Sequence, residues 1–82
     1  MDVLVRLSTD GDSDVRWVVA ENRHTPVDVL VKLSTDEEDS CVRMCVAQNP
    51  NTPVDVLVKL STDEDSDVRR NVAQNPNTPW MD

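Results

Sequence analysis

Residues 52–77, TPVDVLVKLSTDEDSDVRRNVAQNPN, form a unit that the chain repeats almost unchanged. An earlier copy, TPVDVLVKLSTDEEDSCVRMCVAQNPN, occupies residues 25–51, and a shortened copy, DVLVRLSTDGDSDVRWVVAENRH, occupies residues 2–24. Similarity at a fixed period of this length is typical of a solenoid, in which each unit buries its apolar face against its neighbours. The repeats therefore predict a stack of about three similar units.

The length of 82 residues predicts one small domain. We expect a single repeat domain over residues 1–82, because units of this kind are stable only when they stack on one another. The expected units are residues 1–24, 25–51 and 52–77, with residues 78–82 as the start of an incomplete fourth unit.

The first half of each unit, TPVDVLVKL in the third copy, admits two interpretations. Thr52 and Pro53 match an N-cap followed by the first helical residue, and this favours a short helix with 3₁₀ character. Valine or leucine at alternate positions from Val54 to Leu60 also fits a strand, as in a leucine-rich-repeat horseshoe. If the segment is helical, its apolar residues leave few polar sides, so we expect it to be sandwiched between neighbours.

The second half of each unit predicts a helix. In the third copy, Asp65 to Asp67 supply capping groups, and Val68 and Val72 lie one turn apart on an apolar stripe. Asn75 precedes a proline, which disfavours the α conformation and ends the helix. Two helices in each unit predict an all-α solenoid of about three two-helix repeats.

The pattern TPxDxLxxLSTDxDxDVRxxVAxNPN, present in register in two copies, resembles the leucine-rich repeat variant family, whose repeats are similar to HEAT repeats. The resemblance implies alternating α- and 3₁₀-type helices in a right-handed superhelix, and it implies no catalytic residues. Some members carry a cysteine-rich iron–sulfur segment, but this chain lacks four clustered cysteines, so no cofactor is expected. In the third copy the matching residues are Leu57, Leu60, Asp63, Val68, Arg69, Val72, Ala73, Asn75 and Pro76.

The net charge is −8 at pH 7, from 16 acidic and 8 basic residues. This balance argues against nucleic acid and against an anionic membrane surface as partners, since both require basic patches. The sequence has no long apolar run and no signal-peptide pattern, so we expect a cytoplasmic protein. It also lacks a nucleophile with a plausible base, so we expect no enzyme activity.

Positions where the copies differ are the best candidates for recognition. A helical projection of the second halves places variable side chains on the outer side, where an apolar patch with one polar end suits a protein interface or self-association. Both ends of the stack also suit contact between copies, because end repeats bare apolar faces. The interface candidates are Trp17, Val18, Cys41, Met44, Cys45, Arg70, Trp80 and Met81.

Two alternatives to protein contact remain open from the sequence. Cys41 and Cys45, one helical turn apart, suit a thiol redox sensor, although two thiols do not complete a metal site. The acidic turns suit a divalent cation, but valine stands where a calcium loop needs glycine. We therefore expect no metal site, and we expect the turn aspartates to pair with the arginine of the same copy, as in Asp10–Arg16, Asp36–Arg43 and Asp63–Arg69.

Overall fold

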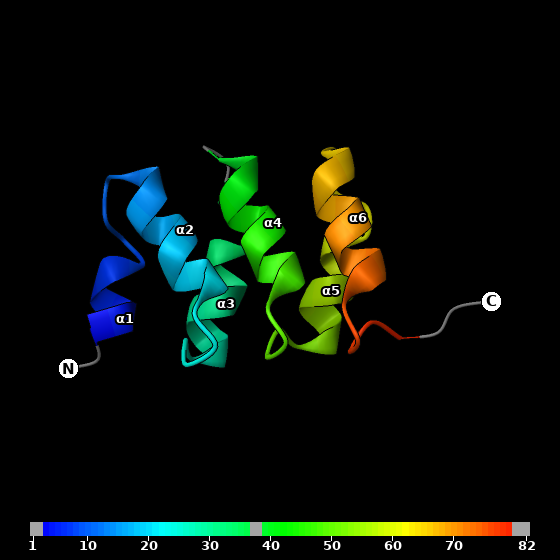
Figure 1. Cartoon of the computed structure of the whole chain (residues 1–82), viewed down its shortest axis with the longest axis horizontal. Helices are drawn as coiled ribbons and strands as arrows, with labels where there is room; N and C mark the ends of the chain where they lie inside the picture. Colours follow the sequence, from blue (N-terminus) through cyan, green and yellow to red (C-terminus); the bar gives the residue numbers. More distant parts are fainter. Residues whose placement is uncertain (1–2, 37–38, 80–82) are drawn as a thin grey trace.

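The computed structural model describes residues 3–36 and 39–79, and within them it contains six α-helices and no strand (Figure 1). The predicted all-α fold is confirmed, and the strand alternative for the first half of each unit is wrong. Each copy contributes one short and one longer helix. The helices are α1 (Val3–Leu7), α2 (Ser13–Glu21), α3 (Val27–Leu33), α4 (Ser40–Gln48), α5 (Val54–Leu60) and α6 (Ser66–Gln74).

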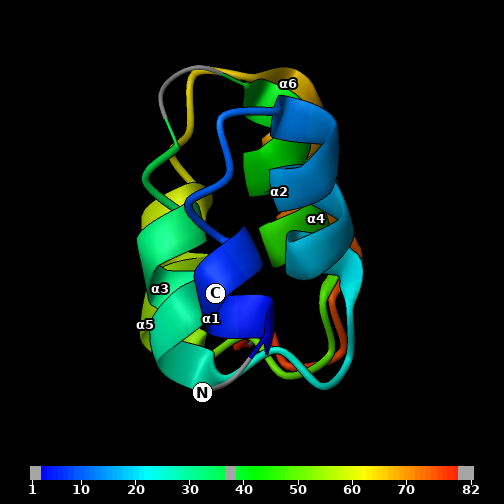
Figure 2. The same cartoon turned by 90° about the vertical axis from the view of Figure 1, so that its left-hand side faces the viewer.

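The helices form two layers along an elongated stack that measures 41 × 22 × 14 Å. Seen along the stack, α1, α3 and α5 make one layer, and α2, α4 and α6 make the other (Figure 2). Successive copies meet mainly through α2 against α4 and α4 against α6. Ala20 and Ala47 lie fully buried on these helices, and their small side chains allow the backbones to approach closely.

The short helices α3 and α5 begin one residue later than the sequence predicted. Pro53 occupies the N-cap with φ −65° and ψ 155°, and its carbonyl accepts from the N–H groups of Val56 and Leu57, each at 3.1 Å. Thr52 is not the cap, because its buried hydroxyl donates to the Val46 carbonyl at 2.5 Å and ties the new helix to the preceding one. These segments are α-helices, with the predicted 3₁₀ character confined to i→i+3 bonds at their ends.

The longer helices begin as predicted at aspartate caps. Asp65 accepts from the N–H of Asp67 at 2.8 Å, and Asp12 and Asp39 cap α2 and α4 in the same way. At the other end, Asn75 is extended, with φ −73° and ψ 128°, as expected for a residue before proline. Caps at equivalent positions keep the helices in register along the stack.

The core lies between the two layers and is continuous from copy to copy. Its fully buried members come from both helix types, including Leu30, Leu57, Val42, Val46 and Val68. A core of this kind has no independent centre in any one unit. The stability of the fold therefore depends on the contacts between successive copies.

Candidate interaction surfaces

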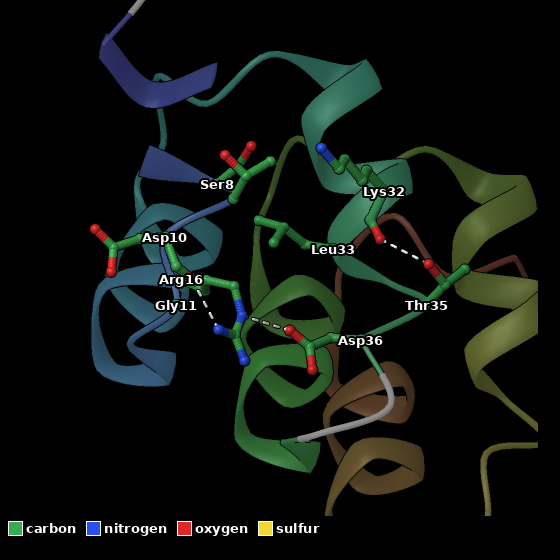
Figure 3. A pocket seen from close by; sticks show the side chains of 9 residues that line it. Ser8, Asp10, Gly11, Arg16, Lys32, Leu33, Thr35 and Asp36 are labelled. Atoms are coloured by element: carbon green, nitrogen blue, oxygen red, sulfur yellow. Dashed lines mark hydrogen bonds and ion pairs between the residues drawn. The ribbon is translucent and has the colours of Figure 1, made fainter. Parts of the chain in front are cut away.

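The arginine in each longer helix links two copies. The Arg43 guanidinium donates through Nη1 to the Asp36 carbonyl at 2.6 Å, and through Nε and Nη2 to the Asp63 carboxylate at 2.8 and 3.2 Å. Arg16 repeats this arrangement with Asp36, at 2.8 Å from its Nε (Figure 3). The predicted pairing within one copy is therefore wrong for the carboxylates, because the turn of the same copy offers its carbonyl and the next copy supplies the acid.

A second set of contacts between copies involves the Asn-Pro-Asn segments, for which the sequence predicted only that they end helices. The Asn49 side chain donates to the carbonyls of Ala20 and Asn22 at 2.9 and 3.0 Å. Asn75 donates in the same way to the carbonyls of Ala47 and Asn49. Asn49 is 2% exposed, so its amide satisfies buried carbonyls that water cannot reach. Recurrence of the asparagine at one position in every copy was the available signal.

The cap aspartates also interact across the stack. The Cys41 N–H lowers the pKa of Asp39 most, against desolvation, and the hydroxyl of Ser13 in the preceding copy lowers it further. The pKa of Asp65 is lowered in the same way by the Asp67 N–H and by Ser40. These carboxylates cap helices by accepting hydrogen bonds from backbone N–H groups, which accounts for the acidic turns without a cation. Within the described residues, no three His, Cys, Asp or Glu side chains gather as a metal site would require.

A polar groove of about 450 Å³ opens where the first two copies meet (Figure 3). Arg16 and Lys32 contribute positive charge, while Asp10 and Asp36 contribute negative charge. Arg16 already donates to the Asp10 carbonyl and to the Asp36 carboxylate, each at 2.8 Å. The groove therefore balances its own charges, and its arrangement suits cohesion between copies better than capture of an anion.

The structure separates the interface candidates of the longer helices. Trp17 and Val18 are exposed, at 39% and 59%, and Cys41 and Arg70 are exposed as well. Met44 is half-buried against the core, and Arg70 pairs with Asp67 of its own helix at 3.0 Å. Trp80 and Met81 lie outside the described residues.

Cys45 is 2% exposed, so the prediction that places it on the outer side is wrong. On its helix it lies toward the preceding copy, where Glu21 and Trp17 influence its thiol. Burial, together with the negative charge of Glu21, raises the pKa of Cys45 to about 12. Desolvation and then the charge of Asp39 raise the pKa of Cys41 as well, so both thiols are held away from the reactive thiolate form.

A row of valines on the layer of short helices was not among the predicted interface residues. We define the valine surface as Val5, Val27, Val31, Val54 and Val58. Each of these side chains is between 41% and 51% exposed. The prediction that the short helices are sandwiched is therefore wrong, because only their other side packs on the core. The signal that could have revealed the row is valine at the same two positions of successive copies, one helical turn apart.

The profile of the family described as leucine rich repeat variant matches residues 42–65, which span the end of the second copy and the start of the third. This match confirms the resemblance stated from the sequence, and the matched family is one of HEAT-like helical repeats. No curated protein and no solved structure matches the chain significantly. None of the helices within residues 3–36 and 39–79 has the length and apolar character that crossing a bilayer requires.

Proposed function

We propose that this chain is a non-catalytic scaffold for protein–protein contact and that the valine surface is its main recognition region. The observation that carries the proposal is that Val31 and Val58, at equivalent positions, are 42% and 44% exposed. Isolated exposed valines are ordinary, but here the same positions are exposed in successive copies, so apolar side chains recur along one layer of the stack. Helical repeats of this family type are typical of interaction modules, which supports the same interpretation.

The surroundings of the row indicate the kind of partner. Asp28 and Lys32 are exposed beside Val27 and Val31 on α3, so charges of both signs border the apolar strip. Interfaces commonly combine an apolar centre with a polar rim of this kind. The partner we propose is a protein that presents a matching apolar strip, such as one face of an amphipathic helix.

We also propose a second contact region on the layer of longer helices. A partner or a second copy of the chain would bind there through Trp17, Val18, Met44 and Arg70. Cys41 belongs with this group because it is exposed. We also propose a cytoplasmic location and a single repeat domain over residues 1–82, as expected from the sequence.

The alternative of a thiol redox sensor receives no support from the geometry. Cys45 is buried and its pKa is raised to about 12, whereas reactive thiols have lowered pKa values and good exposure. The cation alternative receives none either, since the cap carboxylates already accept hydrogen bonds from backbone N–H groups.

The experiment compares partner capture by two variants of equal charge change. In V31K/V58K the row becomes positively charged, whereas Q48K/Q74K adds the same charge at exposed positions on the other layer. Both are first checked for wild-type helicity by circular dichroism. Partners retained from an extract of the source cells by the wild type and by Q48K/Q74K should bind V31K/V58K at least about tenfold more weakly. Equal affinity of V31K/V58K for every retained partner would contradict the proposal.

A further inference from the structure

The two ends of the described stack carry complementary halves of the contacts that join copies inside it. We propose that the end formed by α5 and α6 binds the end formed by α1 and α2 of a second copy, so that chains stack head to tail. This inference uses residues outside the valine surface and goes beyond the function proposed above. It rests on three sets of contacts, each of which is formed between copies inside the molecule and has one unpaired half at each end of the described stack.

The first open contact is Arg69. Its Nη1 donates to the Asp63 carbonyl at 2.6 Å, just as Nη1 of Arg43 donates to the Asp36 carbonyl at 2.6 Å. Arg43 then binds the Asp63 carboxylate of the following copy, whereas no carboxylate in the described part of the chain pairs with Arg69. Arg69 is exposed and is already held by its own turn in the manner that its counterpart uses to bind an acid.

Asp10 is the matching acid at the other end. Its Oδ1 accepts from the Asp12 N–H at 2.9 Å, as Oδ1 of Asp63 accepts from the Asp65 N–H at 2.9 Å. Asp63 thereby presents its carboxylate to Arg43 of the preceding copy. Asp10 has the same local geometry, and no arginine among residues 3–36 and 39–79 pairs with its carboxylate. Arg69 of one copy and Asp10 of another are thus a complementary pair.

The asparagine contacts are open in the same sense. The Asn22 Oδ1 accepts from the His24 N–H at 2.8 Å, which fixes the amide as in Asn49, but its Nδ2 donates to no acceptor in the described structure. At the opposite end, the carbonyls of Ala73 and Asn75 are equivalent to the two acceptors that Asn75 itself uses in the preceding copy. Ala73 is exposed, whereas its counterparts are fully buried.

The N-terminal end also offers an apolar cavity of about 480 Å³. Leu4, Leu7, Val15 and Val18 line it. The equivalent residues of the second copy are Leu30, Leu33, Val42 and Cys45. Each is no more than 3% exposed, because the first copy covers them. The cavity therefore has the apolar lining of an interior seam, and the end formed by α5 and α6 of a second copy is the occupant that fits it.

One contact departs from the interior pattern. Asn51 donates to the Arg23 carbonyl, and Asn77 donates to the Pro50 carbonyl, but histidine stands at the equivalent position 24. We therefore expect the contact between chains to be weaker than the interior seams and to depend on concentration.

The assembly joins two different surfaces, so it does not close into a dimer but continues as an open row. Its average mass should therefore rise steadily with protein concentration. The net charge of −8 opposes association, so the measurement is made at about 0.15 M salt, where repulsion beyond roughly 8 Å is screened.

The test uses charge reversal at each end of the 82-residue chain and follows the mass by light scattering and sedimentation. The variants Arg69→Asp and Asp10→Arg should each lose about tenfold or more in association constant, since like charges then meet. An equimolar mixture of the two variants should recover the association constant. In the mixture, the aspartate introduced at position 69 of one variant meets the arginine introduced at position 10 of the other. Lys32→Asp makes the same charge change as Arg69→Asp in the middle copy and should leave association unchanged.

A third variant guards against loss of folding. Asn22→Asp keeps the oxygen that accepts from His24 but removes the donor, so it should weaken association while helicity stays at the wild-type level. A wild type that stays monomeric at all concentrations would overturn the inference, as would association that none of the end variants weakens or a mixture that fails to recover it. None of these outcomes bears on the capture experiment with V31K/V58K, which fails or succeeds separately.

Discussion

Asn49 and Asn22 occupy the same position in successive copies, yet their surroundings differ. Asn49 is 2% exposed and bridges two carbonyls of the preceding copy, whereas Asn22 has only its local contact with His24 among residues 3–36 and 39–79. Arg43 and Arg69 differ in the same way, since Arg43 binds the carboxylate of the next copy, whereas within the described structure Arg69 binds only the carbonyl of its own turn.

The difference implies that the same residue contributes differently to the free energy of unfolding in an interior seam and at an end of the stack. In a stack, the free energy of unfolding is close to a sum of weak units and strong contacts between neighbours. A residue in a seam should therefore matter to stability, and the same residue at an end should matter mainly to what binds there. Paired substitutions at equivalent positions test this comparison directly.

The largest effect is expected for the core leucines. Leu30 is fully buried, whereas its counterpart Leu4 is half-buried at the end of the stack. Leu30→Ala should lower the free energy of unfolding by about 2–5 kcal/mol, because it leaves a cavity in a seam. Leu4→Ala should cost clearly less, because part of its side chain already meets water. Urea titrations followed by circular dichroism measure both, and equal losses would refute the comparison.

The asparagine bridge should give the next largest effect. Asn49→Ala leaves the buried carbonyls of Ala20 and Asn22 without this donor and should cost about 1–3 kcal/mol in the free energy of unfolding. Asn22→Ala removes only an exposed local hydrogen bond and should cost less than about 1 kcal/mol. The same denaturation experiment distinguishes them. A larger loss for Asn22→Ala would show that the bridge is not what holds the seam.

A smaller and pH-dependent effect is expected at the Arg43–Asp63 pair. Burial raises the pKa of Asp63, but the Arg43 guanidinium and the Asp65 N–H outweigh it, so the pKa lies below its usual value. A carboxylate whose pKa is lowered by folding stabilises the fold above its unfolded pKa, near 4, and loses that contribution as the pH falls through the folded value.

Asp63→Asn should therefore cost about 1.5 kcal/mol at neutral pH, at the low end for a charged hydrogen bond because the pair is partly exposed. The difference from the wild type should shrink below about pH 4. Asp10→Asn, at the equivalent end position, should change stability less at neutral pH. Thermal melts across the acid range test both, and a pH-independent cost for Asp63→Asn would contradict the assignment.

The sequence predicted what is local and missed what depends on the neighbouring copy. The cap at Asp65 and the stop at Asn75 follow from backbone preferences within a few residues, and both are confirmed. The partner of Arg43 could not be predicted, because the acids of its own turn and of the next copy lie at equally plausible positions.

The same limit explains the two errors of burial. A helical projection orders the residues of one helix around its axis, but it does not say where the next copy lies. Cys45 was therefore placed outside although it faces a seam, and the valines of the short helices were placed inside although they face solvent. Repetition in the sequence does not distinguish a buried position from an exposed one, because residues in the seams and residues on the solvent-facing surface both recur in every copy.

The two thiols lie one turn apart on α4 and should differ in reactivity with little effect on the stability of the fold. Cys41 is exposed and should be alkylated in the folded protein, although more slowly than a free thiol because its pKa is raised. Cys45 is buried with a pKa of about 12, so at about pH 8 it should react at least 100-fold more slowly than Cys41 and only through unfolding. Mass spectrometry after iodoacetamide treatment measures the two rates, with Cys41→Ser as the control that isolates Cys45. Since alkylation of Cys45 requires the seam to open, its rate should rise in Asn49→Ala but remain near the wild-type value in Asn22→Ala. If both variants left the rate unchanged, the closure of the seam would not depend on the asparagine bridge.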